Sequence, residues 1–409
     1  MKIGFSKRDI TPTVGCILSG NGDFVSTGIH DPLQARAMVL EESGRRVALV
    51  SCDLLGIAPE QVAGIKSKLK GRGDRVFDQV LITSTHTHNG PTTCFNRPNR
   101  LRHRDEAYLE KLELAVVEAV MEAAGTLNGA VMKTGRGFAD ENFNRRLITP
   151  DGEAHFYNPR TLSKHPEYAD LIGGVADREL NALQFLDAGG RVLLTMVQYA
   201  AHPLSVGQFA HVITRDYCGR LVDLLEAAYG APAIFIQGAC GDLHCRGLFA
   251  GFDRMEEMAG NLAKEVQRVL SFPGLPTIAP TLETASAAIR LEVDQPRRAA
   301  NSWRQEVFGD HYAVEMDAFR LGPIALVGIP GELCSEPGLQ IKSNAAFSQT
   351  WLLYNCNAYA GYLIPRRAYL EKGYEYDATC LLPSACELVV RTASELCRHI
   401  EPVIPSDHR

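Results

Sequence analysis

Three glycine-centred turns constrain the fold of this chain more than any other feature of its sequence. Each turn joins two apolar or alternating runs, which is the pattern of a β-hairpin. The turns are Ser43-Gly44, Gly189-Gly190 and Leu321-Gly322. The second strand of each predicted hairpin runs into a polar segment, at Asp53, His202 and Glu332 in turn. Hairpins require antiparallel pairing, so a purely parallel sheet is excluded.

Further apolar runs predict strands and helices that alternate along the chain. Strands are expected at residues 47–52, 79–83, 192–199, 233–236, 324–329 and 350–354, and helices at 59–70, 106–124, 221–229 and 255–270. Hairpins combined with strand–helix units indicate an α/β fold in which mixed β-sheets pack between helices. Because polar residues follow several strands, we expect a ligand site at that edge of the sheets.

Composition narrows the classes of function. No repeat, low-complexity tract or Pro/Ser-rich linker divides the 409 residues, so we expect a single domain over residues 1–409. The formal net charge of −6 argues against a nucleic-acid partner, which requires a concentrated basic face. One short basic cluster is expected to be a solvated surface, and it comprises Arg100, Arg102, His103 and Arg104.

Targeting and membrane signals are not visible in the sequence. The first residues lack the apolar core of a signal peptide, and no apolar run reaches the roughly 18 residues that span a bilayer. The eleven cysteines form no CxxC pair and indicate reduced thiols. We therefore expect a cytoplasmic protein that acts on a small molecule without membrane insertion. The oligomeric state stays open, and a homo-oligomer is one option.

The segment His86-Thr87-His88-Asn89-Gly90-Pro91 carries the strongest local signal for chemistry. It follows a predicted strand directly, and Gly-Pro turns the chain away. Side chains at alternate positions of an extended segment point the same way, so both imidazoles could face one site. Imidazole is a good ligand for zinc. The alternative is a pair of histidines satisfied by water or by neighbouring loops.

Three further residues admit both a functional and a structural interpretation. His202 ends a predicted strand, where a lone histidine is more often structural. Glu332 could be a metal ligand, a general base or simply the first residue of the next helix. Cys240 lies in Gln237-Gly238-Ala239-Cys240-Gly241-Asp242 and could be a nucleophile if a histidine lies close. A free cysteine is, however, more often a small buried residue.

Taken together, these segments resemble the catalytic domain of the neutral ceramidase family and its shorter bacterial relatives. The resemblance extends from Asp9-Ile10-Thr11-Pro12 to about Glu375. No single motif is decisive, but the order and spacing of the motifs together are specific. The motifs are His30-Asp31-Pro32-Leu33, Val50-Ser51-Cys52-Asp53, Thr85 to Pro91, Asn144-Arg145-Arg146, Ala200-Ala201-His202-Pro203, Gly238 to Asp242, Pro330-Gly331-Glu332 and Tyr359-Ala360-Gly361-Tyr362.

The resemblance implies an α/β fold with mixed sheets and a zinc ion as cofactor. The four zinc ligands of the family fall, by motif position, on His86, His202, Glu332 and Tyr362. A second histidine and an arginine near the metal fall on His88 and Arg145. The sequence departs from the long ceramidases at His244, which takes the place of a catalytic serine after Gly241-Asp242. The chain also ends at Arg409, too soon for their immunoglobulin-like C-terminal domain.

These residues predict a zinc-dependent hydrolase that cleaves an amide (N-acyl) bond of a small soluble substrate by zinc-activated water. Arg145 would stabilise the developing oxyanion, and His88 or His244 would protonate the leaving amine. One alternative is a zinc-dependent hydrolase of an ester, a lactone or another polar bond. A second alternative is a metal-binding relative without catalytic activity.

Overall fold

All three predicted hairpins are present in the computed structural model, which describes residues 1–20, 24–72, 76–94, 105–171 and 173–402. Strand β3 (Gln34–Glu42) pairs antiparallel with β4 (Arg45–Cys52), β11 (Glu179–Leu186) with β12 (Val192–Tyr199), and β17 (His311–Leu321) with β18 (Ile324–Gly328). The basic cluster at Arg100, Arg102, His103 and Arg104 lies outside the described residues.

Each hairpin belongs to a larger sheet, and the three sheets share one topology. A strand from earlier in the chain pairs antiparallel with the first hairpin strand, and a later strand pairs parallel with the second. The earlier strands are β1 (Lys2–Asp9), β7 (Val131–Phe138) and β16 (Leu282–Glu292). The later strands are β5 (Gln79–Ser84), β14 (Ala233–Gln237) and β20 (Gln349–Leu353). The sequence shows no repeat, yet the same unit occurs three times.

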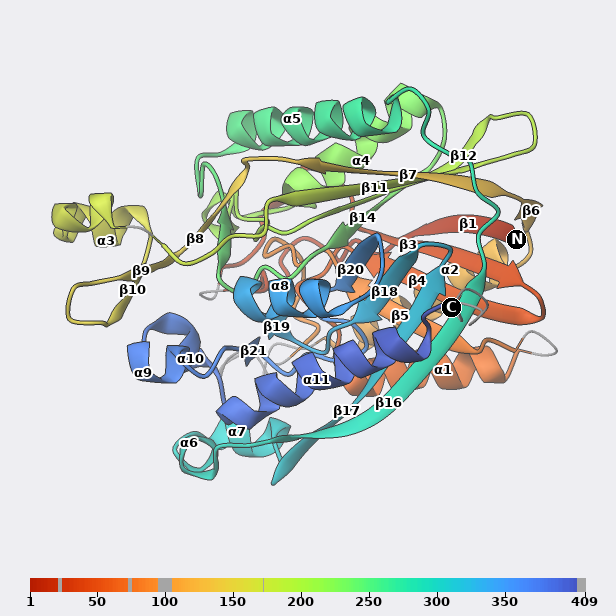
Figure 1. The fold of residues 1–409 in the computed structure, drawn as a ribbon. Helices are drawn as coiled ribbons and strands as arrows, with labels where there is room; N and C mark the ends of the chain where they lie inside the picture. The colour runs from red at the N-terminus through yellow and green to blue at the C-terminus, as the bar shows by residue number, and fades with distance from the viewer. Residues whose placement is uncertain (21–23, 73–75, 95–104, 172, 403–409) are drawn as a thin grey trace, which may run out of the picture.

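Two helices complete each unit, one before the parallel strand and one after it. They are α1 (Pro59–Lys70) and α2 (Glu106–Ala123), α4 (Asp216–Tyr229) and α5 (Phe252–Leu270), and α8 (Ser335–Asn344) and α11 (Pro383–His399). Helices α4 and α5 cover the sheet of β7, β11, β12 and β14 on one side of the molecule, while α8 and α11 lie on another (Figure 1). None of the described helices is long and apolar enough to cross a bilayer.

Four apolar cores explain this arrangement. In each unit, one face of the sheet packs against the unit's own helices. The opposite faces of all three sheets meet in a shared core, to which Leu49, Met196, Ile234, Leu326 and Trp351 contribute. Burial of both faces explains why the central strands read as continuous apolar runs. The predicted fold class, mixed β-sheets packed between helices, is therefore confirmed.

Helix α4 begins five residues earlier than the sequence predicted. Its first turn contains Gly219, a poor helix former, although Tyr217 and Cys218 continue the buried face of the helix. The carboxylate of Asp216 accepts backbone N–H groups of Ser205 and Val206. The loops that follow β5, β12, β14, β18 and β20 meet at one edge of the sheets, as the strand directions require. Gly241 allows two of these loops to approach closely, since a Cβ there would lie 2.6 Å from the carbonyl oxygen of Glu332.

Candidate active site

Three side chains from three different units meet at the edge where the strands end. His86 follows β5, His202 follows β12, and Glu332 opens the short strand β19 (Glu332–Leu333) after β18. Oε2 of Glu332 lies 3.5 Å from Nε2 of His86 and 3.6 Å from Nε2 of His202. All three are almost fully buried. His86 has φ +69°, a rare conformation for a residue with a side chain, which marks a locally constrained position.

The hydrogen bonds of His86 and His202 set both rings in the same tautomer. Nδ1 of His86 donates to the carbonyl oxygen of Leu55 at 2.7 Å, and Nδ1 of His202 donates to that of Cys240 at 2.8 Å. The lone pair of each ring therefore lies on Nε2, the nitrogen that faces Glu332. Burial, with Arg145 nearby, lowers the pKa of His202 to about 4, so this ring is neutral at pH 7. Histidines that bind metals usually show this pattern.

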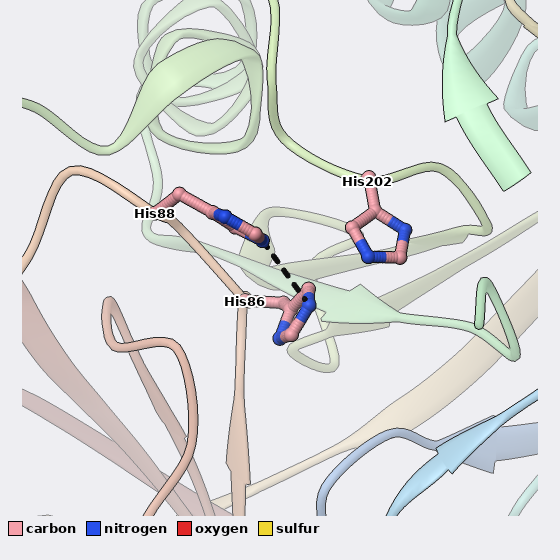
Figure 2. Close-up of side chains that lie close together, drawn as sticks. All are labelled: His86, His88 and His202. Atoms are coloured by element: carbon pink, nitrogen blue, oxygen red, sulfur yellow. Dashed lines mark hydrogen bonds between the residues drawn. The ribbon is translucent and has the colours of Figure 1, made fainter. Parts of the chain in front are cut away.

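His88 lies in the same cluster but has the opposite tautomer. Its Nε2 is 3.4 Å from Nε2 of His86, and the three imidazoles of His86, His88 and His202 converge on one point (Figure 2). Nε2 of Gln208 donates to the carbonyl oxygen of Ser19 at 3.1 Å, which fixes the orientation of the amide. The same nitrogen lies 3.3 Å from Nδ1 of His88, so Nδ1 accepts and Nε2 carries the hydrogen. In this tautomer, Nε2 is a donor and not a metal ligand.

Two tyrosine hydroxyls hold the carboxylate of Glu332. Tyr359 donates to Oε1, and Tyr354 donates to Oε2 at 3.2 Å. Both hydroxyls donate to the carboxylate, and hydrogen bonds of this kind favour its ionised form. The carboxylate therefore stays ionised at neutral pH. Sequence reasoning missed Tyr354, and it noted Tyr359 only as part of a motif.

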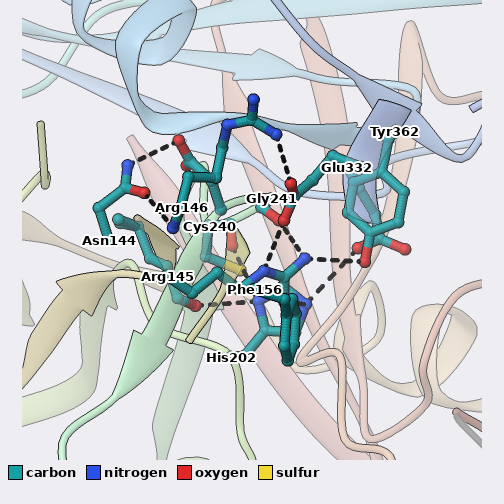
Figure 3. A network of polar contacts seen from close by, with 12 residues as sticks. Asn144, Arg145, Arg146, Phe156, His202, Cys240, Gly241, Glu332 and Tyr362 are labelled. Carbon is teal, nitrogen blue, oxygen red and sulfur yellow. Dashed lines mark hydrogen bonds and ion pairs between the residues drawn. The ribbon is translucent and has the colours of Figure 1, made fainter. Parts of the chain in front are cut away.

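Arg145 lies at the centre of the polar network beside the cluster (Figure 3). Its Nε donates to Glu375 at 2.7 Å, and its Nη2 donates to the carbonyl oxygen of Gly241 at 2.7 Å and to the hydroxyl of Tyr362 at 3.1 Å. Its Nη1 lies 3.4 Å from Nε2 of His202 and contacts no oxygen among the described residues. Sequence reasoning missed the role of Glu375, which also pairs with Arg146.

Tyr362 and His244 complete the set of residues predicted from the sequence. Burial raises the pKa of the Tyr362 hydroxyl well above its usual value, so it is protonated where it accepts from Arg145. His244 lies beside His202, with the two ring centroids 5.8 Å apart. All seven predicted residues are thus brought together. Asp53, the third polar residue at a hairpin end, lies elsewhere and accepts the backbone N–H of Gln34.

The cysteine alternative loses support in the structure. Cys240 is fully buried, and burial raises the pKa of its thiol well above the usual value. A nucleophilic cysteine requires the opposite, a thiolate that forms near neutral pH. What Cys240 contributes is its backbone carbonyl, which orients His202.

The donor set fits a transition metal ion such as zinc. Two imidazoles in the same tautomer present Nε2 beside a carboxylate, and nitrogen and oxygen ligands of this kind suit zinc better than magnesium or calcium. In the part of the chain that the structure describes, only the cluster of His86, His88 and His202 brings three potential ligand atoms within 4.8 Å of one another.

Comparison with known proteins places the chain in a family. The model of the neutral/alkaline non-lysosomal ceramidase N-terminal family matches residues 1–242, which is more than half of the chain. This chain belongs to the neutral/alkaline non-lysosomal ceramidase family. The resemblance read from the sequence is therefore confirmed. Residues from Asp9 to Asp242, with His86, Arg145 and His202 among them, lie within the part that the family model matches.

Two relatives show how far the family likeness extends. The neutral ceramidase of Pseudomonas aeruginosa is 28% identical over 229 residues, which cover 53% of this chain and 32% of that protein. Neutral ceramidase 2 of Arabidopsis thaliana is 23% identical over 237 residues, which cover 55% of this chain and 30% of that protein. The aligned region spans about a third of the length of these ceramidases.

A solved structure shows the same fold. The crystal structure of neutral ceramidase from Pseudomonas aeruginosa superposes with a TM-score of 0.79 at 20% sequence identity, and it covers 100% of this chain and 76% of that one. At this level of identity the likeness establishes the fold of the family, and the arrangement of three sheets is shared with it.

Proposed function

We propose that this chain is a zinc-dependent hydrolase that cleaves an amide bond of a small, water-soluble substrate. The observation that carries this proposal is the pair of imidazoles, His86 and His202, both in the ligand tautomer beside the ionised carboxylate of Glu332. The family supports the bond type, because its curated relatives are named ceramidases, and ceramide is an amide.

The proposed ligands are His86, His202, Glu332 and Tyr362. A metal ion held by these residues would supply an activated water nucleophile and would polarise the carbonyl group that is attacked. Tyr362 is the fourth ligand in this proposal, because its hydroxyl lies on the same side of the site as Arg145. Its phenol would have to lose its proton on binding, as a cation beside it favours.

The remaining polar residues act on the substrate in this proposal. Nη1 of Arg145 is the guanidinium nitrogen that faces His202, and it would donate to the oxyanion that forms from the carbonyl oxygen. Nε2–H of His88 points into the cluster and would donate a hydrogen bond to the same region. His244, on the other side of His202, would contact the leaving group or its substituent.

Two features support a small and soluble substrate. An imidazole at position 244, packed against Phe156, occupies more of the site wall than a serine would. The residues of the site are at least nine-tenths buried, as a confined pocket requires. We also propose a cytoplasmic location, which is supported by the eleven cysteines, all of them free thiols.

The proposal is tested by metal analysis and by a substrate panel. Protein purified without chelator should contain about one zinc per chain, and it should hydrolyse short N-acyl amides faster than long-chain ceramide in detergent. His86→Ala should abolish both metal content and turnover, whereas the exposed His399→Ala should change neither. Full activity without bound metal would refute the metal mechanism, and rapid turnover of ceramide alone would refute the substrate class.

A further inference from the structure

His244 is buried in the site wall without any hydrogen-bond partner among the described residues. Neither Nδ1 nor Nε2 has one, and the side chain is only 1% exposed. The ring lies between His202, at 5.8 Å, and Phe156, at 5.1 Å, with Phe143 6.0 Å away. Its backbone is fixed by the short strand β15 (Leu243–Cys245), which pairs with β8 (Asn142–Asn144) and bridges to His202.

The other histidines of the site are all satisfied. His86 bonds to Leu55, His202 to Cys240, and His88 to Gln208. Buried polar groups in folded proteins almost always have a partner, because an unpaired one retains the full cost of leaving water. His244 is therefore the one imidazole of this site whose partner is not supplied by the described residues. Its aromatic neighbours, Phe143 and Phe156, have no donor or acceptor atom that could bond to the nitrogens of the imidazole.

The position of the ring indicates where that partner comes from. His244 is adjacent to His202 and Phe156, and Arg145 lies over the ring of Phe156 at 5.0 Å, so these four groups lie side by side. A molecule that places its scissile carbonyl between His202 and Arg145 would bring its nearest substituent to His244. An imidazole offers one N–H donor and one acceptor nitrogen, which is the complement of a hydroxyl or an amide group.

We propose that His244 is a specificity-determining residue that hydrogen-bonds a hydroxyl or amide substituent of the substrate, within a few bonds of the scissile carbonyl. The inference rests on the proposed amide hydrolysis and deepens it. It predicts a substrate with a polar substituent at that point. A site built to hydrogen-bond such a group strongly rejects the analogue that lacks it, because its own buried polar group is then left unpaired.

The test compares substrate pairs that differ by one hydroxyl group. Suitable pairs are N-acetylethanolamine with N-acetylethylamine, and an N-glycolyl amide with the N-acetyl amide of the same amine. For at least one pair, the metal-loaded enzyme should prefer the hydroxylated member in kcat/KM by about 100-fold or more. His244→Phe keeps the ring and removes both nitrogens, so the preference should fall to about threefold or less at unchanged metal content. His244→Gln, which retains a donor and an acceptor, should keep part of it.

Binding measurements separate this inference from the proposed function. Calorimetric titration of the same pairs into wild-type and His244→Phe protein reports the preference even if no bond is cleaved. A preference in binding without turnover would refute the hydrolase proposal and leave the role of His244 standing. Equal binding and equal turnover of both members of each pair, or a preference that persists in His244→Phe, would overturn the inference. His244→Leu repeats the test if the phenylalanine variant does not fold.

Discussion

The side-chain nitrogen of Gln208 lies 3.3 Å from Nδ1 of His88, and this contact determines which ring nitrogen of His88 carries the hydrogen. Gly20 makes the contact possible, because a Cβ at this position would lie 1.9 Å from the Gln208 nitrogen and 2.4 Å from Nδ1 of His88. One glutamine thereby distinguishes a histidine that donates into the site from the two that present lone pairs.

Gln208→Glu should invert the tautomer of His88. The new carboxylate would accept a hydrogen from Nδ1, so the lone pair would move to Nε2, where it can bind the metal. We expect metal affinity to rise while kcat falls by roughly 10–100-fold, the usual scale for outer-shell changes. Chelator competition and nitrogen NMR of the imidazoles measure the two effects. Unchanged ring shifts would contradict the tautomer assignment, and Gln208→Leu controls for loss of the contact alone.

Replacing a proposed metal ligand and replacing His88 should have different effects on metal content. His202→Ala should lose metal and activity together, since an imidazole in the ligand tautomer is deleted. His88→Ala should keep metal, with a loss of roughly 10–100-fold in affinity or activity. Elemental analysis after dialysis gives the metal content of each variant. A His202→Ala protein that retains full zinc would show that the ligand is assigned to the wrong residue.

Tyr359→Phe should weaken metal binding by roughly 10–100-fold without unfolding the protein, because the hydroxyl holds Oε1 of Glu332. Tyr199→Phe is a matched control, since its buried hydroxyl bonds to Ala139 and Glu141, away from the cluster. The control should lose about 1 kcal/mol of stability and no metal affinity. Equal metal affinity in both variants would show that the Tyr359 hydroxyl does not help Glu332 to bind the metal.

The stability of the metal-free protein should fall as the pH is lowered from 6.5 towards 4. The pKa of His202 is about 4 in the folded protein and about 6.5 in the unfolded chain, so over this window protons bind preferentially to the unfolded state. The loss should reach about 3 kcal/mol. Denaturant titrations at several pH values measure it, and His202→Asn should make the profile less steep. The remaining slope would come from His88 and His244, whose pKa values burial also lowers. A wild-type profile as flat as that of the variant would argue against a neutral buried ring.

Arg145→Lys should leave the metal in place and reduce kcat by about 10²–10³-fold, the scale seen when one oxyanion donor is removed. Lysine keeps the charge near Glu375 but cannot reproduce the fork that reaches Gly241 and Tyr362. If the variant lost metal but kept kcat per bound ion unchanged, Arg145 would position the metal ligands and would not stabilise the oxyanion.

The parts of this structure that follow from local patterns were predicted well. Hairpins and buried strands are specified by turn residues and apolar runs, and the strand ends then bring His86, His202 and Glu332 together. Gln208 and Glu375 were missed, because their partners His88 and Arg145 lie 120 and 230 residues away and no local spacing marks them. Tyr354 was missed because it ends a buried strand and was counted there as an apolar residue. The repeated three-unit topology was also missed. The three units share a strand order and an apolar pattern, but different residues occupy equivalent positions, so the sequence shows no repeat. That residues 1–409 form a single domain stays a prediction.

The distribution of the proposed ligands over three units has a consequence for how the molecule folds. His86, His202 and Glu332 each follow a strand of a different sheet, and each sheet packs on its own helices in its own apolar core. A partly folded chain in which one unit has separated would retain at most two of the three groups and would bind the ion weakly. The ion would then favour the fully assembled state by mass action, by about 2.7 kcal/mol at a concentration 100 times its Kd. Metal binding would thus add to the shared core in coupling the three units into one cooperative unfolding transition.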